Sequence, residues 1–138
     1  MSDQIPSEAP EATMDTAVRV SRQVSHPIDD VWKVLLTDEG TEALLGPGGK
    51  LGTKGQGWQA DDGTHGVTRS FHAKEQIRFS WHRDQDAPAT IVDLELAPVD
   101  DNTTKLEIVH DKLPVDADRE WLSDRWTKAL DRIADDAL

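Results

Sequence analysis

Short runs of alternating apolar and polar residues follow one another through most of the chain. In the clearest run, Ile77, Phe79 and Trp81 alternate with polar neighbours, a period of two that is typical of a strand with one buried face. Turn-forming sequences such as Asp61-Asp62-Gly63 and Asp100-Asp101-Asn102 separate consecutive runs, which favours antiparallel neighbours. The alternation predicts strands at residues 17–24, 56–60, 67–73, 76–83, 90–97 and 104–110.

Helical spacing first replaces this alternation directly after the first predicted strand. Pro27 suits the first turn of a helix, where its missing N–H costs nothing, and Asp29 and Asp30 suit the positive end of the helix dipole. A second short helix is expected at residues 39–45, before the glycine-rich residues 46–49 that would end it. Two short helices are therefore predicted between the first and second strands.

The last segment of the chain predicts the longest helix. It begins near Pro114, with Asp116 or Asp118 at its start. Its apolar residues recur at three- and four-residue intervals and form one side of the helix, which must be buried. These residues are Leu122, Trp126, Ala129, Leu130, Ile133 and Ala137. The inward face of the sheet is available to bury them.

This order of elements predicts an α+β fold in which a curved antiparallel sheet wraps around the long C-terminal helix. The length of 138 residues suits one domain, which we place at residues 16–138. Residues 1–15 contain acidic residues, proline and small residues but no basic residue, so we expect a flexible tail there. A sheet that grips a helix usually leaves a cavity, which favours a binding role over a catalytic one.

The composition excludes several classes of function. The formal net charge is −12, and an acidic surface repels nucleic acid and anionic membranes. The absence of cysteine excludes disulfides, cysteine-based zinc sites and thiol catalysis. The N-terminus lacks the pattern of a signal peptide, and no stretch approaches the roughly 20 apolar residues of a membrane span. We therefore expect a cytoplasmic protein with no nucleic-acid partner and no membrane insertion.

Several motifs stand in an order and spacing that resemble a known family. They are Val20, Arg22, Val24, Pro27, Ile28, Val31 and Trp32; Leu45-Gly46-Pro47; Asp62-Gly63 and Gly66-Val67; Ile77, Phe79, Ser80 and Trp81; Thr103, Thr104, Leu106, Ile108 and His110; and Trp126 with Leu130. Over about residues 16–138 the chain resembles the activator-of-Hsp90-ATPase-homologue-1-like domain of the START-like (SRPBCC, or polyketide-cyclase-like) superfamily. Members of that family often carry an aromatic residue where this chain has Leu44, so the mouth of any pocket is expected to differ.

The resemblance implies a fold rather than an activity. Members of the superfamily share the START/Bet v 1-like helix-grip fold, and many enclose a cavity. Relatives nevertheless range from ligand-binding proteins to a co-chaperone domain, because unrelated functions can be built on one fold. The resemblance therefore supports the predicted architecture and leaves the function open.

Five tryptophans in a chain without tyrosine are its sharpest compositional feature. Trp32 lies on the stripe of the first helix and is expected to pack against the sheet, whereas Trp121 lies off the last helix's stripe and is expected to be partly exposed. Inward aromatic residues elsewhere either fill a core or line an apolar ligand site. The candidate ligand-binding residues are Trp58, Phe71, Phe79, Trp81, Leu94, His110 and Trp126.

Polar residues at or near the inward face allow more than one interpretation. His110 either bonds a ligand, acts as an acid or base, or is a core histidine with its hydrogen bonds satisfied. Arg22 needs a carboxylate, which a structural aspartate or a ligand would supply. Asp61 and Asp62 stand at a turn and are expected to be solvated. The glycine-rich residues 46–57 do not match a phosphate-binding loop, so we expect a mobile loop that gates the cavity.

No catalytic residue, metal ligand or cofactor is assigned from the sequence. His65, His72 and His82 lack the spacing of metal ligands, and no nucleophile-elbow motif occurs. The leading hypothesis is a non-enzymatic protein that holds a small hydrophobic or amphipathic ligand between the sheet and the C-terminal helix. The alternative is a co-chaperone-like module whose acidic surface meets a basic face of a chaperone or other protein. A third is a cyclase- or hydratase-like enzyme that uses His110.

Overall fold

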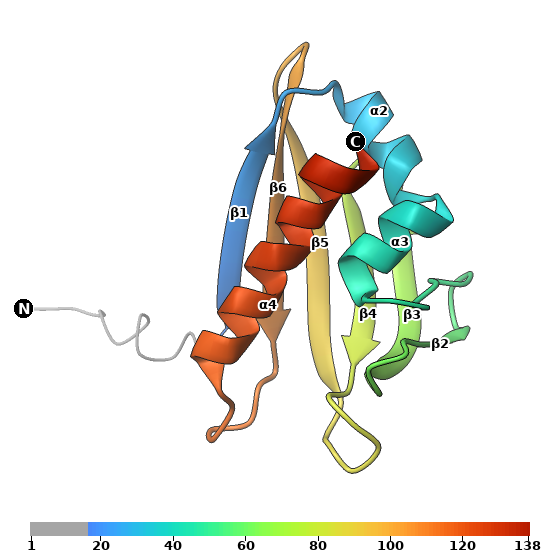
Figure 1. Ribbon diagram of the computed structural model, residues 1–138, viewed down its shortest axis with the longest axis vertical. Coiled ribbons are helices and arrows are strands. Elements are labelled where there is room, and N and C mark those ends of the chain that lie inside the picture. The colour runs from blue at the N-terminus through green and yellow to red at the C-terminus, as the bar shows by residue number, and fades with distance from the viewer. Residues whose placement is uncertain (1–16) are drawn as a thin grey trace, which may run out of the picture.

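The computed structural model describes residues 17–138, and the tail predicted at residues 1–15 lies outside this range. Six strands form one sheet in which every neighbouring pair is antiparallel. Their order across the sheet is β1-β6-β5-β4-β3-β2, so the first strand lies beside the last (Figure 1). The strands are β1 (Val18–Val24), β2 (Gly57–Gln59), β3 (His65–His72), β4 (Gln76–Trp81), β5 (Thr90–Asp100) and β6 (Thr103–Asp111).

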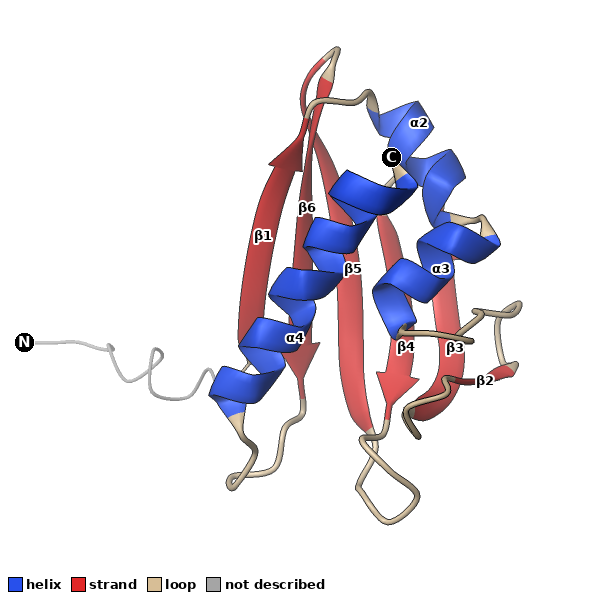
Figure 2. Cartoon of the chain, viewed as in Figure 1, coloured by secondary structure: helices blue, strands red, loops and turns tan. Residues whose placement is uncertain are grey.

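The helices lie together on one face of this sheet (Figure 2). They are α2 (Ile28–Leu35), α3 (Asp38–Leu45) and α4 (Arg119–Arg132), which continues as a single π-helical turn, η2 (Ile133–Ala137). The long helix α4 crosses the sheet diagonally, with α3 packed beside it (Figure 1). The predicted helix-grip architecture is confirmed, including the two short helices after the first strand. Within the described residues, no helix combines the length and apolar character needed to cross a membrane.

The strand register explains which side chains face the helices. Residues directly opposite each other in an antiparallel pair lie on the same face of the sheet. Across β4, β5 and β6, one row contains Ile77, Leu94 and Ile108, and the next contains Phe79, Val92 and His110. All six side chains have an exposed fraction of 0%. The alternation in the sequence therefore identified the inward face of the central strands correctly.

Helix α4 begins directly after Asp118, the second of the two aspartates that the sequence offered as its start. The Asp118 side chain accepts a hydrogen bond from the Trp121 N–H at 3.0 Å, so Asp118 rather than Asp116 is the N-cap. Thr37 caps α3 in the same way, accepting from the Gly40 N–H at 3.0 Å. The apolar stripe of the last helix is buried as predicted at Leu122, Trp126, Ala129, Leu130 and Ile133, whereas Ala137 near the end of the chain is only partly buried.

Strand β3 begins two residues before the position that the alternation predicted, because Gly66 permits a very close approach to β4. A Cβ atom at Gly66 would lie 1.8 Å from the carbonyl oxygen of Ser80, which no side chain could tolerate. The indole Nε1 of Trp58 donates to the same oxygen at 3.2 Å. Glycine at this position therefore holds the short edge strand β2, with its tryptophan, against the core.

Arg22 has the structural aspartate partner that the sequence allowed. From the edge strand β1, its Nη1 donates to Asp131 of α4 at 2.5 Å, and its Nη2 donates to Asp135 of η2 at 3.3 Å. Both aspartates are more than a third exposed. The arginine thus joins the last helix to the edge of the sheet, and these contacts account for the cation that interrupts the valine face of β1.

Candidate functional site between the sheet and the last helix

Aromatic side chains from the sheet and from α4 form one continuous cluster. The ring centroid of Phe79 lies 5.7 Å from that of Trp58 and 6.5 Å from that of Trp126. Trp81 extends the cluster, with its centroid 5.9 Å from Trp126. These contacts are edge-to-face, so the positive edge of one ring meets the negative face of the next. The side chains therefore pack in specific orientations and fill the space between sheet and helix.

The structure brings six of the seven candidate ligand-binding residues into this buried region and separates one. The exposed fraction is 0% for Phe79, Leu94, His110 and Trp126, 3% for Trp81 and 4% for Trp58. Phe71 is only partly buried and packs against Trp32 of α2, 6.5 Å away between centroids. Because four of the side chains have no exposed surface, a ligand can touch them only if the packing around them changes. Their role in ligand binding stays a prediction.

Three consecutive hydrogen bonds define the state of His110. The indole Nε1 of Trp126, which can only donate, lies 3.0 Å from His110 Nδ1, so Nδ1 carries the lone pair. The proton of the neutral ring is then on Nε2, which lies 2.7 Å from the Thr90 hydroxyl. That hydroxyl donates to the Trp81 carbonyl at 2.7 Å. These bonds connect α4, β6, β5 and β4 through one buried imidazole.

The surroundings keep this imidazole neutral. Burial, and secondarily the positive charge of Arg125, lower the pKa of His110 from 6.5 to about 4, against a weaker opposing effect of Asp111. A protonated ring would also turn an N–H toward the indole N–H of Trp126, replacing a hydrogen bond with two facing donors. Of the three interpretations of His110, the geometry supports the core histidine with satisfied hydrogen bonds, because both ring nitrogens already have partners.

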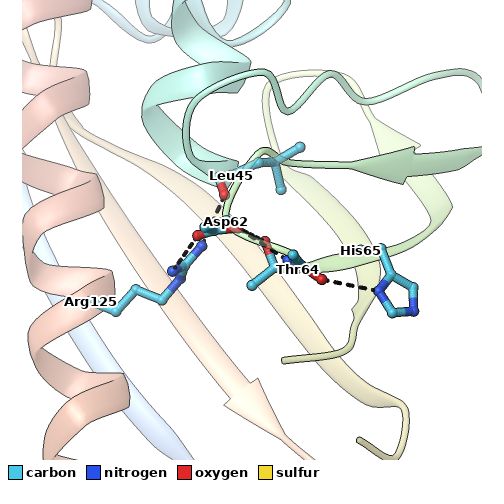
Figure 3. Close-up of polar contacts among 6 residues, drawn as sticks. Leu45, Asp62, Thr64, His65 and Arg125 are labelled. Atoms are coloured by element: carbon cyan, nitrogen blue, oxygen red, sulfur yellow. Dashed lines mark hydrogen bonds and ion pairs between the residues drawn. The ribbon is translucent and has the colours of Figure 1, made fainter. Parts of the chain in front are cut away.

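Arg125, the residue before Trp126, joins the end of α3 and the turn before β3 to α4 (Figure 3). Its Nη1 donates to the Asp62 carboxylate at 3.0 Å, and its Nη2 donates to the Leu45 carbonyl at 2.9 Å. The other oxygen of Asp62 accepts from the hydroxyl and the N–H of Thr64, at 2.6 and 3.1 Å. Burial opposes ionisation of Asp62, but the bonds from Thr64 and Arg125 outweigh it and lower its pKa.

Asp62 is exposed to solvent, as the sequence predicted, but it is also held by protein partners. Its carboxylate anchors the turn before β3 to the last helix, because the arginine of α4 and the hydroxyl of Thr64 both bind it. The guanidinium of Arg125 also lies among three indole rings, whose centroids are 5.5 to 5.8 Å from its central carbon. These rings belong to Trp81, Trp121 and Trp126.

The sequence pattern does not indicate a role for Arg125, although two of its contacts lie in motifs that resemble those of the family. Leu45-Gly46-Pro47 supplies the carbonyl, and Asp62-Gly63 supplies the carboxylate. Gly46 has a φ of +111°, and a Cβ atom there would meet Asp62 at 3.4 Å and Arg125 at 3.6 Å. Glycine suits this crossing point because a side chain would be strained at that φ. Nothing in the sequence indicated that a cation would face both motifs, and such an indication was needed to find Arg125.

A pocket of about 240 Å³ opens at the end of the sheet where α4 begins. It lies between the β4–β5 loop and the segment that leads from β6 into α4. Its buried lining residues are Trp81, Thr90 and Leu122, and its charged lining residues are Arg83, Asp116 and Asp118. Trp81 is the candidate ligand residue that contributes to this pocket, and the loops around it lie at the lower end of the sheet in Figure 1.

Two histidines without metal-ligand spacing in the sequence come together where β3 begins and β4 has just ended. His65 and His82 face each other across an antiparallel bridge, with parallel rings 4.6 Å apart between centroids. Within residues 17–138, no group of three or more His, Cys, Asp or Glu side chains is arranged to hold a metal ion.

A family comparison classifies the chain. The model described as activator of Hsp90 ATPase homolog 1-like protein matches residues 25–136. The chain belongs to this family. The matched range includes the aromatic cluster, the Arg125 contacts and the pocket at the start of α4. No curated protein matches the sequence of this family member.

Solved structures of low sequence identity share the fold. DynU16, a putative protein in the dynemicin biosynthetic locus, has 22% identity and a TM-score of 0.71 over 87% of this chain and 46% of its own. The Aha1 dimer from Colwellia psychrerythraea has 14% identity and a TM-score of 0.71, over 88% and 96% of the two chains. PFC0360w, an HSP90 activator from Plasmodium falciparum, has 19% identity and a TM-score of 0.66, over 81% and 88%. This chain thus spans less than half of DynU16.

Proposed function

We propose that this family member is a binding protein whose ligand is a small apolar or amphipathic molecule, held in the pocket at the start of α4. The supporting observation is that pocket itself, about 240 Å³ in volume and lined by the buried side chains of Trp81 and Leu122. Ligand sites are commonly concave and largely apolar with a few polar groups, and this pocket has both properties. Arg83, Asp116 and Asp118 supply the polar groups.

The volume limits the size of the ligand. Most sites for drug-sized molecules measure about 300–1,000 Å³, so a pocket of 240 Å³ suits a smaller molecule. At about 30 Å³ for each water in the liquid, the pocket has the volume of about eight waters. We infer a ligand of about ten non-hydrogen atoms, or the end of a longer molecule whose remainder lies outside.

The position of the pocket revises the leading hypothesis from the sequence. That hypothesis placed the ligand among all seven inward residues, but the aromatic cluster already fills the middle of that space with edge-to-face contacts. Displacing those rings would expose completely buried side chains. A ligand at the start of α4 avoids this cost. A catalytic use of His110 has less support than binding, since both ring nitrogens of this residue are engaged.

A substitution that fills the pocket tests the proposal. We expect aromatic fragments of six to twelve non-hydrogen atoms to bind the protein in ligand-observed NMR. Ala117→Phe, which places a ring into the pocket lining, should weaken that binding at least tenfold, whereas Val99→Phe, at a half-exposed position outside the pocket, should leave it unchanged. The proposal is wrong if none of the fragments binds, or if the Ala117 variant binds them as well as the wild type.

A second candidate function is an interaction with an Hsp90-type chaperone, favoured by the family and by one surface feature. Trp121 is 37% exposed, and the guanidinium of Arg83 stacks 4.3 Å from its ring centroid. Exposed tryptophan and arginine side chains are frequent anchors of protein interfaces. Val115, 92% exposed, lies in the segment that leads into the same helix.

Purified chaperone of the same host tests this second function. Calorimetry should detect a complex with the wild type, and Trp121→Ala should weaken it at least tenfold. The matched control is Val99→Ala, which removes an exposed apolar side chain elsewhere. The absence of a complex with the wild type at micromolar concentration would rule out this second function and would leave the ligand proposal unaffected.

A further inference from the structure

The three buried tryptophans differ in one respect that bears on the ligand. The indole N–H of Trp58 donates to the Ser80 carbonyl at 3.2 Å, and that of Trp126 donates to His110 at 3.0 Å. The indole N–H of Trp81 is buried as well but meets no acceptor within residues 17–138. Buried indole N–H groups usually have a partner, because removing a donor from water without replacing its hydrogen bond is unfavourable. Trp81, whose indole N–H lacks an acceptor, is also the tryptophan that lines the pocket at the start of α4.

We propose that the pocket selects molecules with a neutral carbonyl oxygen, which accepts a hydrogen bond from the indole N–H of Trp81 while the apolar body lies against Leu122. This inference rests on the proposed function, since it assigns a ligand class to the same pocket. The indole Nε1 of Trp81 has almost no accessible surface, so a ligand oxygen reaches it only when side chains of the pocket lining shift, and that oxygen then leaves bulk water. The hydrogen bond would then form with little competition from solvent.

Neighbouring side chains are poorly suited to satisfy this N–H themselves. The Thr90 hydroxyl gives its proton to the Trp81 carbonyl and faces the Nε2 proton of His110, so it is already engaged on both sides. Arg125, whose guanidinium carbon lies 5.5 Å from the Trp81 centroid, offers donors only. The guanidinium of Arg125 and the indole N–H of Trp81 are both donors, so the surroundings of the Trp81 ring favour the partial negative charge of an oxygen. A ligand in the pocket can supply the acceptor that neither Thr90 nor Arg125 provides.

The charged lining favours a neutral carbonyl over a carboxylate or an amine. A carboxylate would gain from Arg83 but would face Asp116 and Asp118 across the same small pocket. A protonated amine would gain from the aspartates, but it has no lone pair for the indole N–H. A ketone, aldehyde or ester oxygen accepts the bond without bringing a charge among these groups. Pro88 and Pro114 add apolar lining for the rest of such a molecule.

Acetophenone and ethylbenzene form a matched pair of probes, because they differ by the carbonyl and are otherwise similar in size. Titration of the ¹⁵N-labelled protein, followed by two-dimensional NMR, resolves one indole N–H signal for each of the five tryptophans. We expect acetophenone to bind about fivefold to tenfold more tightly than ethylbenzene, the effect of one added hydrogen bond. The Trp81 signal should move downfield with acetophenone and stay nearly unchanged with ethylbenzene.

Two variants separate the donor from the ring. Trp81→Phe keeps an aromatic side chain and removes the N–H, so it should bind both probes with equal affinity. Trp58→Phe removes a buried N–H that already has a partner, so it should keep the preference for acetophenone. The signal shift in the wild type remains decisive even if a variant fails to fold.

The outcomes distinguish the two proposals. Equal affinity of the wild type for both probes, or a Trp81 signal that acetophenone does not move, overturns the carbonyl preference while the pocket remains a binding site. If neither probe binds in the pocket at millimolar concentration, the proposed function is overturned and the ligand class with it. Preferential binding of acetophenone with a shifted Trp81 signal supports both.

Discussion

Acidification should destabilise the folded protein, because the fold keeps the buried imidazole of His110 neutral. Its pKa is about 4 in the folded protein, against 6.5 for an ordinary histidine. In this range the unfolded chain binds the additional proton more readily, so the free energy of unfolding decreases as the pH falls below 6.5. The decrease from this group ends near pH 4, where the folded state also binds the proton. At 1.36 kcal/mol for each pKa unit, the total loss is about 3 kcal/mol.

His110→Gln provides a reference that does not titrate. A glutamine amide has one acceptor and a donor group, so it can accept from Trp126 and donate to Thr90 as the neutral imidazole does. Urea unfolding of both proteins at pH 7, 6, 5 and 4 gives the difference in their free energies of unfolding. Taking this difference removes the contribution of carboxylates that titrate in the same range in both proteins.

We expect the stability of the wild type relative to His110→Gln to fall by about 3 kcal/mol between pH 7 and pH 4. The decrease should be spread over the interval below pH 6.5, at a slope approaching 1.4 kcal/mol per pH unit. A difference that stays constant across this range would refute the reasoning, since it would mean that the folded and unfolded states bind a proton at His110 equally well.

Three further predictions concern contacts that the structure identified. Gly66→Ala should destabilise the fold by more than about 2 kcal/mol in urea unfolding, because the new Cβ meets a carbonyl oxygen at 1.8 Å, while Gly55→Ala, with no atom within 4 Å, should cost only about 1 kcal/mol from its positive φ. Arg125→Ala should cost about 3 kcal/mol and speed hydrogen exchange in the loop between α3 and β3. Asp62→Ala should show a smaller effect in the same exchange measurement, since the bond to the Leu45 carbonyl remains; equal effects of both variants would contradict this account. Arg22→Ala should change the free energy of unfolding by less than about 1 kcal/mol, because both of its carboxylate partners are exposed to water, and a larger loss would show that this estimate for surface ion pairs does not apply here.

The elements were predictable from the sequence because burial on one face imposes a period on the chain. The alternation of Ile77, Phe79 and Trp81 required one face of β4 to be inward, and all three are buried. The spacing of Trp126 and Leu130 required a buried helix stripe, which the structure shows. The early start of β3 was not predictable in this way, since it depends on the close approach of β3 and β4 at one glycine.

The sequence could not decide between the functional hypotheses, because periodicity does not show which groups from other elements meet a side chain. Periodicity could place His110 on the inward face, but it could not say whether a ligand or a protein group would meet its nitrogens. The structure supplies Trp126 and Thr90 as partners, and both come from other elements. Likewise, an inward Trp81 was expected, whereas its indole N–H without an acceptor became visible only when all neighbouring groups had positions.

The order of the elements, the inward face of each central strand and the similarity to the family could all be read from the sequence, because these depend on local spacing. Three features became visible only in the folded structure: the aromatic rings that fill the middle of the space between the sheet and α4, the pocket at the start of α4, and the contacts by which Arg125 joins Leu45 to Asp62. Such features depend on distances between residues far apart in the chain. Hydrogen bonds and close packing act over a few ångströms, so their partners are known only after folding has brought them together.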